Sequence, residues 1–305
     1  MVPLRTLLER RESVILMGIL NRTPDSFSDG GRYLDDAAAL ARVDTMIEEG
    51  AAIVDVGAES TRPGAPSVSD AEQIDRLGDV VRAAAARGVL VSIDTTSPVV
   101  AERALRDGAR LVNSVSLEPA ADLGALAAAH GAALVLMHSR GAMTAMAGFS
   151  VYAEDAYADV VADVAREWSA AAGRALRSGL PREALILDPG LGFFKNARQS
   201  LELCARLDEL CALGFPVLVG PSRKSFVARV ASAELGPPAP PSRRLGGSVA
   251  AAIACVERGA AIVRAHDVAD VKQALAVAAA VRAARAGQRE QARAPGHATA
   301  EVGRA

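Results

Sequence analysis

Eight short apolar runs, separated by polar loops and helix-like stretches, constrain the fold of this chain more than any other sequence feature. Each run is rich in Val, Ile and Leu, which is typical of strands buried on both faces of a parallel sheet. Strands that alternate with helices predict such a sheet, and eight strands close a single-domain (β/α)8 TIM barrel. The runs are Val14–Leu20, Ala52–Val56, Val89–Ile93, Leu111–Val115, Ala133–Met137, Ala184–Leu187, Phe215–Val219 and Ala261–Val263. An open doubly wound α/β sheet is the alternative, but no GxGxxG motif follows the first run, which weakens its dinucleotide-binding version.

The stretches between the runs carry signals for the ends of helices. Ser69 stands three residues before Glu72, which is the spacing of a capping box. Ser97 followed by Pro98 predicts an N-cap and a first-turn proline. Glycines such as Gly131 stand just before later runs, where they fit the left-handed position that ends a helix.

The composition indicates one aliphatic domain without a strong charge. Aromatic residues make up only 3% of the 305 residues, and the formal net charge is −2, so we expect neither a nucleic-acid nor a membrane partner. We expect an N-terminal segment over 1–12, the barrel over 13–285 and a disordered tail over 286–305. The N-terminus lacks a continuous apolar core, and the three cysteines have no metal-binding spacing, so we expect a cytoplasmic protein.

Polar residues stand at the carboxyl end of every run. In a (β/α)8 barrel these ends meet on one face, where active sites form. Buried polar groups are costly unless they are paired, so eight polar strand ends are not explained by chance. The residues are Asn21, Asp55, Asp94, Asn113, His138, Asp188, Lys224, Arg264 and His266.

These strand-end residues fall into two chemical sets. The acids, amide and amine of Asp94, Asn113, Asp188 and Lys224 suit a flat heterocycle with several ring N–H and carbonyl groups. The second set suits a phosphate or diphosphate, because guanidinium groups bind such anions through paired hydrogen bonds. Its members are Asn21, Arg62, Arg264 and His266.

Six sequence blocks, in order, resemble those of the dihydropteroate synthases, which are pterin-binding (β/α)8 enzymes. The resemblance extends over about residues 13–285, and the blocks are jointly specific although each is short. They are MGILNRTPDSFSDGG (Met17–Gly31), GAESTRPGA (Gly57–Ala65), SIDT (Ser92–Thr95), DPGLGFFK (Asp188–Lys195), SRKSF (Ser222–Phe226) and RAHDV (Arg264–Val268).

The resemblance implies a role for each matching residue. The pterin ring would contact Thr61, Asp94, Asn113, Asp188 and Lys224. Asn21 would coordinate Mg²⁺, and the diphosphate would be held by Arg62, Arg264 and His266. The p-aminobenzoate pocket would be shaped by Pro63, Phe193, Lys195 and Ser222. Of these, the residues expected to act in catalysis are Asp94, Lys224, Arg264 and His266. The resemblance also implies a homodimer formed by helices of the C-terminal half.

The implied reaction condenses a pterin diphosphate with an aromatic amine. The amine of p-aminobenzoate displaces diphosphate from the methylene carbon of 6-hydroxymethyl-7,8-dihydropterin diphosphate, which gives 7,8-dihydropteroate. Orientation and stabilisation of the leaving charge would then be the contribution of the protein. Ser222 need not be a nucleophile, and no Ser-His-Asp arrangement supports one.

Several positions depart from the family pattern. Arg22 replaces a small apolar residue, so it either adds a diphosphate contact or disturbs its loop. Ser114 replaces an aspartate, which we expect to remove a carboxylate beside the pterin pocket. Ala58 replaces a glycine, and Pro221 lacks an amide hydrogen. Asp55 either hydrogen-bonds loop backbone or binds substrate.

Two alternative functions remain open. Arg22 and Ser114 favour a degenerate paralogue that binds pterin without turnover. A pterin-dependent methyltransferase would also hold a folate-like ring in a barrel. It has no need of diphosphate-binding cations, however, and Arg62, Arg264 and His266 are all present.

Overall fold

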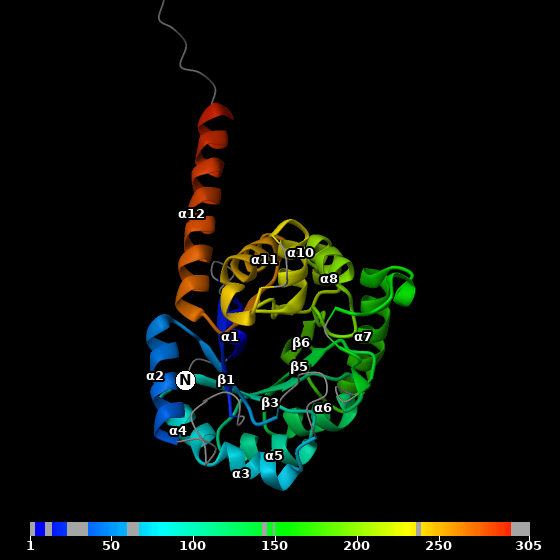
Figure 1. Ribbon diagram of the computed structural model, residues 1–305. Coiled ribbons are helices and arrows are strands. Elements are labelled where there is room, and N and C mark those ends of the chain that lie inside the picture. Colours follow the sequence, from blue (N-terminus) through cyan, green and yellow to red (C-terminus); the bar gives the residue numbers. More distant parts are fainter. Residues whose placement is uncertain are drawn as a thin grey trace, which may run out of the picture.

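In the computed structural model, residues 4–9, 14–22, 36–59, 67–141, 145–148, 150–235 and 239–293 are described. Across these residues, eight parallel strands form one sheet in the order β6-β5-β4-β3-β2-β1-β8-β7 (Figure 1). The strands are β1 (Ile15–Asn21), β2 (Ile53–Gly57), β3 (Leu90–Asp94), β4 (Leu111–Ser114), β5 (Ala133–Met137), β6 (Leu185–Asp188), β7 (Leu218–Val219) and β8 (Ile262–Ala265). A bridge between Leu187 and Val217 joins the two edges of the sheet, so the expected TIM barrel is confirmed.

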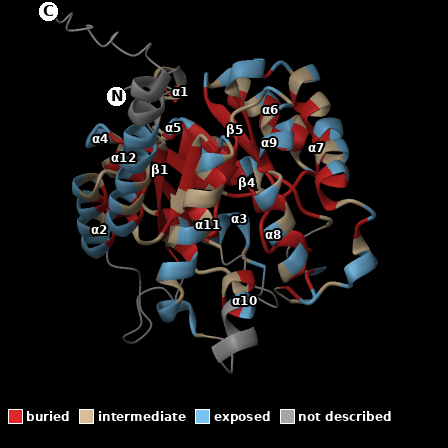
Figure 2. Ribbon diagram, turned by 90° about the horizontal axis from the view of Figure 1, so that it is seen from above, coloured by how far each residue is buried: buried red, intermediate tan, exposed pale blue. Residues whose placement is uncertain are grey.

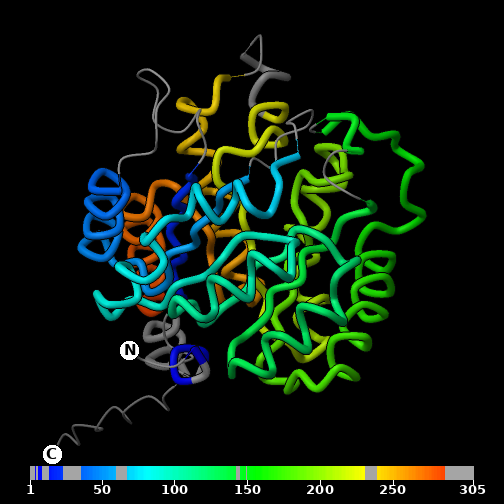
Figure 3. Tube along the Cα trace, turned by 90° about the horizontal axis from the view of Figure 1, so that it is seen from below, coloured from blue at the N-terminus to red at the C-terminus, as the bar shows by residue number. Residues whose placement is uncertain are grey.

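Helices surround the barrel and follow the strands in alternation, as the sequence predicted. They are α2 (Asp36–Glu49), α3 (Asp70–Leu77), α4 (Val80–Ala86), α5 (Pro98–Arg106), α6 (Ala120–Ala129), α7 (Val160–Arg177), α8 (Ala197–Ala205), α9 (Leu207–Cys211), α10 (Ser225–Leu235), α11 (Leu245–Glu257) and α12 (Val268–Arg293). The short helix α1 (Leu4–Glu9) lies at the end of the barrel opposite α10 (Figures 2 and 3).

The serines predicted to begin helices do cap them, although the expected capping box is incomplete because the Glu72 side chain pairs with Arg76. The Ser69 hydroxyl accepts a hydrogen bond from the Glu72 amide, and the Ser97 hydroxyl accepts one from the Val100 amide. Both bonds satisfy amides that have no partner within the helix. The expected barrel boundary at residue 285 falls inside α12, which continues to Arg293 and projects past the barrel (Figure 1). Residues 294–305 of the expected tail lie outside the described residues.

Two apolar layers hold the barrel together. An inner layer contains one or more side chains from every strand, and Leu4 of α1 packs against it at the amino-terminal end. An outer layer lies between the strands and the helices, whose outward faces are exposed (Figure 2). Trp168 of α7 is fully buried there, and its indole N–H donates to the Leu136 carbonyl oxygen at 2.9 Å.

No helix within the described ranges is long and apolar enough to cross a membrane. The three cysteines, all of them in described helices, are free.

Candidate active site

The inward-facing side chains change from apolar to polar toward the carboxyl end of the barrel. Because side chains alternate between the faces of a strand, Asp55 follows Ile53 inward. The register of the neighbouring strands places Asp94 beside Asn113. The polar surface that results is made of Asp55, Ser92, Asp94, Asn113, Asp188 and Arg264.

Arg264 of β8 is held between two aspartates of neighbouring strands. Its Nε donates to Oδ2 of Asp55 at 2.6 Å, and its Nη2 donates to Oδ2 of Asp94 at 2.7 Å. The Asn113 amide also donates to Oδ2 of Asp55, at 3.0 Å. Asp55 has no exposed surface, so it orients Arg264 and Asn113 and does not touch a ligand itself. Neither sequence-based reading of Asp55 included this role.

Burial adjusts the acid–base behaviour of the site. It raises the pKa of Asp94 to about 7, although the Arg264 charge opposes the rise. Burial also raises the pKa of Asp188, against the opposing charge of Lys224. The same desolvation lowers the pKa of Lys224 to about 8. Strongly shifted groups gathered at one end of a barrel are typical of a functional site.

Lys224 reaches across to the turn that follows β6. Its Nζ donates to the Leu191 carbonyl oxygen at 2.6 Å and lies 4.0 Å from the centre of the Phe193 ring. Gly192 lies in the same turn with a backbone φ of +79°, a conformation that favours glycine. The Gly190 amide donates to Oδ1 of Asp188 at 2.7 Å. Asp188, Phe193 and Lys224 are therefore brought together, as the sequence predicted.

Ser222 and His266 form a second pair at the edge of the site. The His266 amide donates to the Ser222 hydroxyl oxygen at 3.2 Å, and that oxygen lies 2.9 Å from Nδ1 of His266. The hydroxyl hydrogen is thus free to be donated to Nδ1, which places the imidazole proton on Nε2. Burial, followed by the Arg264 charge, lowers the pKa of His266 to about 4. His266 therefore contributes a neutral N–H donor and not a cation. No carboxylate among the described residues pairs with it.

Asn21 ends β1 at the same face, in register with Gly57. Its side chain is partly exposed, and no described side chain hydrogen-bonds to it. Thr61, Arg62 and Pro63, which the sequence assigned to the site, lie outside the described residues.

The structure places Lys195, which the sequence assigned to the aminobenzoate pocket, behind the turn that follows β6. Its side chain has no exposed surface. The ammonium group donates to the carbonyl oxygens of Gly190 and Phe193 at 3.1 and 3.0 Å. Lys195 therefore supports the turn after β6 from behind, and its Nζ also lies 3.0 Å from Nδ1 of His138.

Two departures from the family pattern make contacts that were not predicted from the sequence. Arg22 is 3% exposed and pairs with Asp36 at 2.6 Å, while its Nε donates to the Arg76 carbonyl oxygen. Arg22 thus joins β1 to α2 and α3, while its Nη1 is buried without a hydrogen-bond partner among the described residues. The loop that Arg22 was expected to disturb, residues 23–35, lies outside the described residues. Ser114 follows the inward-facing Asn113, so it points to the other face of β4, where it hydrogen-bonds the Ser116 backbone. No carboxylate is lost from the inner surface there.

An apolar group lies beside the polar surface, and of its members only Phe193 was assigned to the site from the sequence. It comprises Val115, Met137, Met146, Phe193 and Phe194, with Tyr152 packed against it. Met137 could have been found, because it is the inward position that follows Val135 on β5. The remaining members come from distant loops and have no shared local signal.

Comparisons with known proteins agree with this arrangement. A family model described as "Pterin binding enzyme" matches residues 17–266. A dihydropteroate synthase of Mycobacterium leprae is 44% identical over 271 residues, which are 88% of this chain and 93% of the relative. The Xanthomonas albilineans dihydropteroate synthase solved with 4-aminobenzoic acid is 38% identical, with a TM-score of 0.79 over 90% of this chain and 94% of that one. The Thermus thermophilus enzyme in complex with 6HMPPP is 41% identical, with a TM-score of 0.73 over 89% and 95% of the two chains.

The fold, the convergent strand-end residues and these similarities over most of the chain lead to one assignment. The chain belongs to the pterin-binding enzymes and, among them, to the dihydropteroate synthase family.

Proposed function

We propose that this protein joins 6-hydroxymethyl-7,8-dihydropterin diphosphate to p-aminobenzoate and releases 7,8-dihydropteroate and diphosphate. One observation carries the proposal. A single inward surface combines ring-binding acids and an amide with the guanidinium of Arg264, which two aspartates hold in place. A relative solved with 4-aminobenzoic acid and another solved with 6HMPPP support the same pair of substrates.

The pterin ring would lie on the polar surface at the carboxyl end of the barrel, which is the floor of the site. Asp94 and Asp188 offer carboxylate oxygens to its N–H groups, and Lys224 offers an ammonium donor to its carbonyl or ring nitrogen. The Asn113 amide is already oriented, because its Nδ2 donates to Asp55 and its Oδ1 is left to accept. A substrate that presents these complementary groups would be aligned without rearrangement of the floor, which lowers the entropic cost of reaching the reactive geometry.

The chemical step would be a displacement at the methylene carbon of the pterin. The amine nitrogen of p-aminobenzoate forms the new C–N bond, the C–O bond to diphosphate breaks, and diphosphate leaves with the electron pair. The amine gives up a proton as the bond forms. Arg264 and the Nε2 proton of His266 would stabilise the charge that develops on the leaving group. Ser222 would fix the His266 tautomer and would not act as a nucleophile.

Mg²⁺ is a further part of this proposal. Magnesium prefers oxygen ligands and usually keeps several waters and substrate phosphates with few protein ligands. Asn21 fits that pattern, because its partly exposed amide has no described side-chain partner. No cluster of three or more acidic, histidine or cysteine residues occurs among the described residues, so Asn21 would share the ion with the diphosphate. The ion would neutralise diphosphate oxygens.

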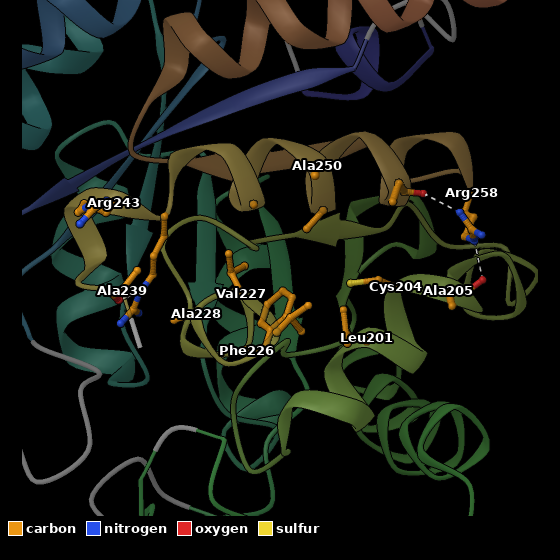
Figure 4. A pocket seen from close by; sticks show the side chains of 15 residues that line it. Leu201, Cys204, Ala205, Phe226, Val227, Ala228, Ala239, Arg243, Ala250 and Arg258 are labelled. Atoms are coloured by element: carbon orange, nitrogen blue, oxygen red, sulfur yellow. Dashed lines mark hydrogen bonds between the residues drawn. The ribbon is translucent and has the colours of Figure 1, made fainter. Parts of the chain in front are cut away.

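We also propose that the protein is a cytoplasmic homodimer. Free thiols at all three cysteines suit a reducing compartment. An apolar groove of about 470 Å³ lies between α8, α10 and α11, on the outside of the barrel and away from the strand ends (Figure 4). Leu201 and Val230 beside it are 41% and 49% exposed, and Arg243 and Arg258 stand among the lining residues. A second copy of this surface would remove the apolar area from water.

The oligomeric state tests the groove. Ala250→Glu places a charge among its lining residues and should shift the protein to a monomer in sedimentation experiments. Val99→Glu on α5 is the control, because that side chain is 54% exposed but lies outside the groove. A native protein that sediments as a monomer would contradict the dimer.

The assay that tests the activity uses the purified protein with both substrates and Mg²⁺, and chromatography of 7,8-dihydropteroate. Arg264→Met is the matched variant. It should lose turnover while it still binds 6-hydroxymethyl-7,8-dihydropterin without its diphosphate more tightly than it binds the diphosphate form. Pterin binding by the native protein without any product would favour the degenerate paralogue. Methyl transfer from methyltetrahydrofolate to a corrinoid protein would favour the methyltransferase.

A further inference from the structure

A buried polar network lies behind the turn that joins β6 to α8, outside the residues assigned above to ligands. It consists of His138 at the end of β5, Arg140, Tyr157, Glu167 on α7 and Lys195. His138 and Lys195 have no exposed surface. A buried network of this kind rigidifies its surroundings when every member is paired, and it is costly when one member is missing.

The hydrogen bonds fix the tautomer of His138. Burial lowers the pKa of Lys195 to about 7. Its Nζ lies among the carbonyl oxygens of Gly190 and Phe193 and 3.0 Å from Nδ1 of His138, so the amine donates there and Nδ1 accepts. The imidazole proton is then on Nε2, which donates to Oε2 of Glu167 at 3.0 Å. Arg140 completes the chain by donating to Oε1 of Glu167 at 2.6 Å. Each charge in the chain has a partner of opposite charge or a neutral acceptor.

The side chains of the network donate hydrogen bonds to the carbonyl oxygens of the turn. Lys195 holds those of Gly190 and Phe193, and the Tyr157 hydroxyl donates to that of Phe194 at 3.1 Å. From the ligand side, Lys224 holds that of Leu191 at 2.6 Å. Four carbonyl oxygens of one turn are therefore held from two sides.

The turn has a conformation that needs this support. Phe194 adopts a φ of +51°, which costs free energy for a residue other than glycine. Gly190 has a φ of +68°, and an added Cβ would lie only 2.1 Å from the His138 carbonyl oxygen. This strained conformation places the Phe193 ring beneath Lys224, with its centre 4.0 Å from Nζ.

We propose that Lys195 is a positioning residue for both substrates. It fixes the conformation of the turn that carries Phe193 and the carbonyl acceptor of Lys224. His138 and Glu167 in turn fix the position of the Lys195 amine. This inference rests on the proposed function, because it assigns Lys195 to the same site. It replaces a contact role in the aminobenzoate pocket with a supporting role behind it. Lys195 would touch neither substrate.

The first experiment compares Lys195→Met with Trp168→Phe. The methionine keeps most of the length of the side chain but removes both hydrogen bonds to the turn and the one to His138. We expect the KM for p-aminobenzoate and the Kd for the pterin diphosphate to rise about tenfold or more, which corresponds to the loss of a charge-assisted hydrogen bond. Trp168→Phe disturbs the packing of α7 on β5 without touching the turn, so it should lower the melting temperature and leave KM unchanged.

The second experiment removes the two hydrogen bonds of His138 one at a time. In His138→Asn the amide oxygen replaces Nδ1 and keeps an acceptor for Lys195. In His138→Gln the terminal amide replaces Nε2 and keeps the donor to Glu167. We expect the asparagine variant to retain a KM within about threefold of the native value, and the glutamine variant to resemble Lys195→Met.

The outcomes separate this inference from the proposed function. A native protein that binds both substrates but makes no dihydropteroate contradicts the function, while the Kd for pterin diphosphate still tests the turn. If Lys195→Met unfolds, the two His138 variants decide instead. An unchanged Kd and KM in a folded Lys195→Met protein, or equal effects of the two His138 variants, would overturn the positioning role.

Discussion

The Arg264→Met substitution gives the sharpest prediction of this structure. Methionine preserves most of the aliphatic stem of Arg264 but removes the guanidinium that bridges Asp55 and Asp94. Both aspartates are buried within the barrel mouth, with side chains 0% and 11% exposed. Removal of one partner from a buried ion pair leaves an uncompensated charge, which typically costs about 3–5 kcal/mol of stability.

The loss of stability should grow with pH. A carboxyl group whose folded pKa is raised binds more protons in the folded state, so stability falls as pH rises toward that pKa. In the native protein the pKa of Asp94 is raised by burial to about 7, while Arg264 limits the rise. Without Arg264 the pKa of Asp94 moves higher still. Between about 7 and that higher pKa, each pH unit then adds about 1.4 kcal/mol to the difference between variant and native protein.

The free energy of unfolding of both proteins should be measured by urea denaturation at about pH 6 and about pH 8.5. We expect the loss of stability caused by the substitution to be about 2 kcal/mol larger at the higher pH. Arg82→Ala is the matched control, because Arg82 also bridges two aspartates, Asp79 at 2.9 Å and Asp107 at 2.7 Å. Its side chain is 59% exposed, so the control should change stability little. Equal losses at both pH values, or an equal loss in the control, would refute the reasoning.

Three further predictions concern single contacts. Lys224→Met should weaken pterin binding about 10- to 100-fold in calorimetry. The affinity of the native protein for pterin should decline as pH rises through about 8, because burial lowers the pKa of Lys224 to about 8. An unchanged affinity in the variant would contradict the placement of Lys224 in the pterin site. Asn21→Ala should raise the Mg²⁺ concentration needed for half-maximal activity, and a native metal titration would argue against a ligand role. Trp168→Phe should cost about 1–3 kcal/mol in thermal unfolding, because it leaves the Leu136 carbonyl oxygen without its partner; full native stability would show that the pair contributes nothing.

The barrel was predictable because its signals are local and repeated. A strand buried on both faces needs only a run such as Ala133–Met137, which the sequence delimits as the structure does. The bounds of the other strands differ from those of the apolar runs by one to three residues at one or both ends. β3, for example, includes Asp94, because a polar residue still pairs in the ladder at the mouth of the barrel. The length of α12 was missed because polar helix-forming residues near its end also resemble a tail.

The sequence by itself determined which residues stand at the carboxyl ends of the strands, since the period of two along each strand and the eightfold repetition are properties of the chain alone. The tertiary structure decided what those residues do to one another. Lys195 lies within a motif that resembles a ligand-contacting block, yet it faces His138, which is 57 residues away. Asp55 accepts a hydrogen bond from Arg264, which is 209 residues away in the sequence. The first pairing depends on the packing of the loops after β5 and β6, and the second on the closure of the barrel, because only closure brings the first and last strands together. These tertiary contacts decide which polar groups are left for a ligand.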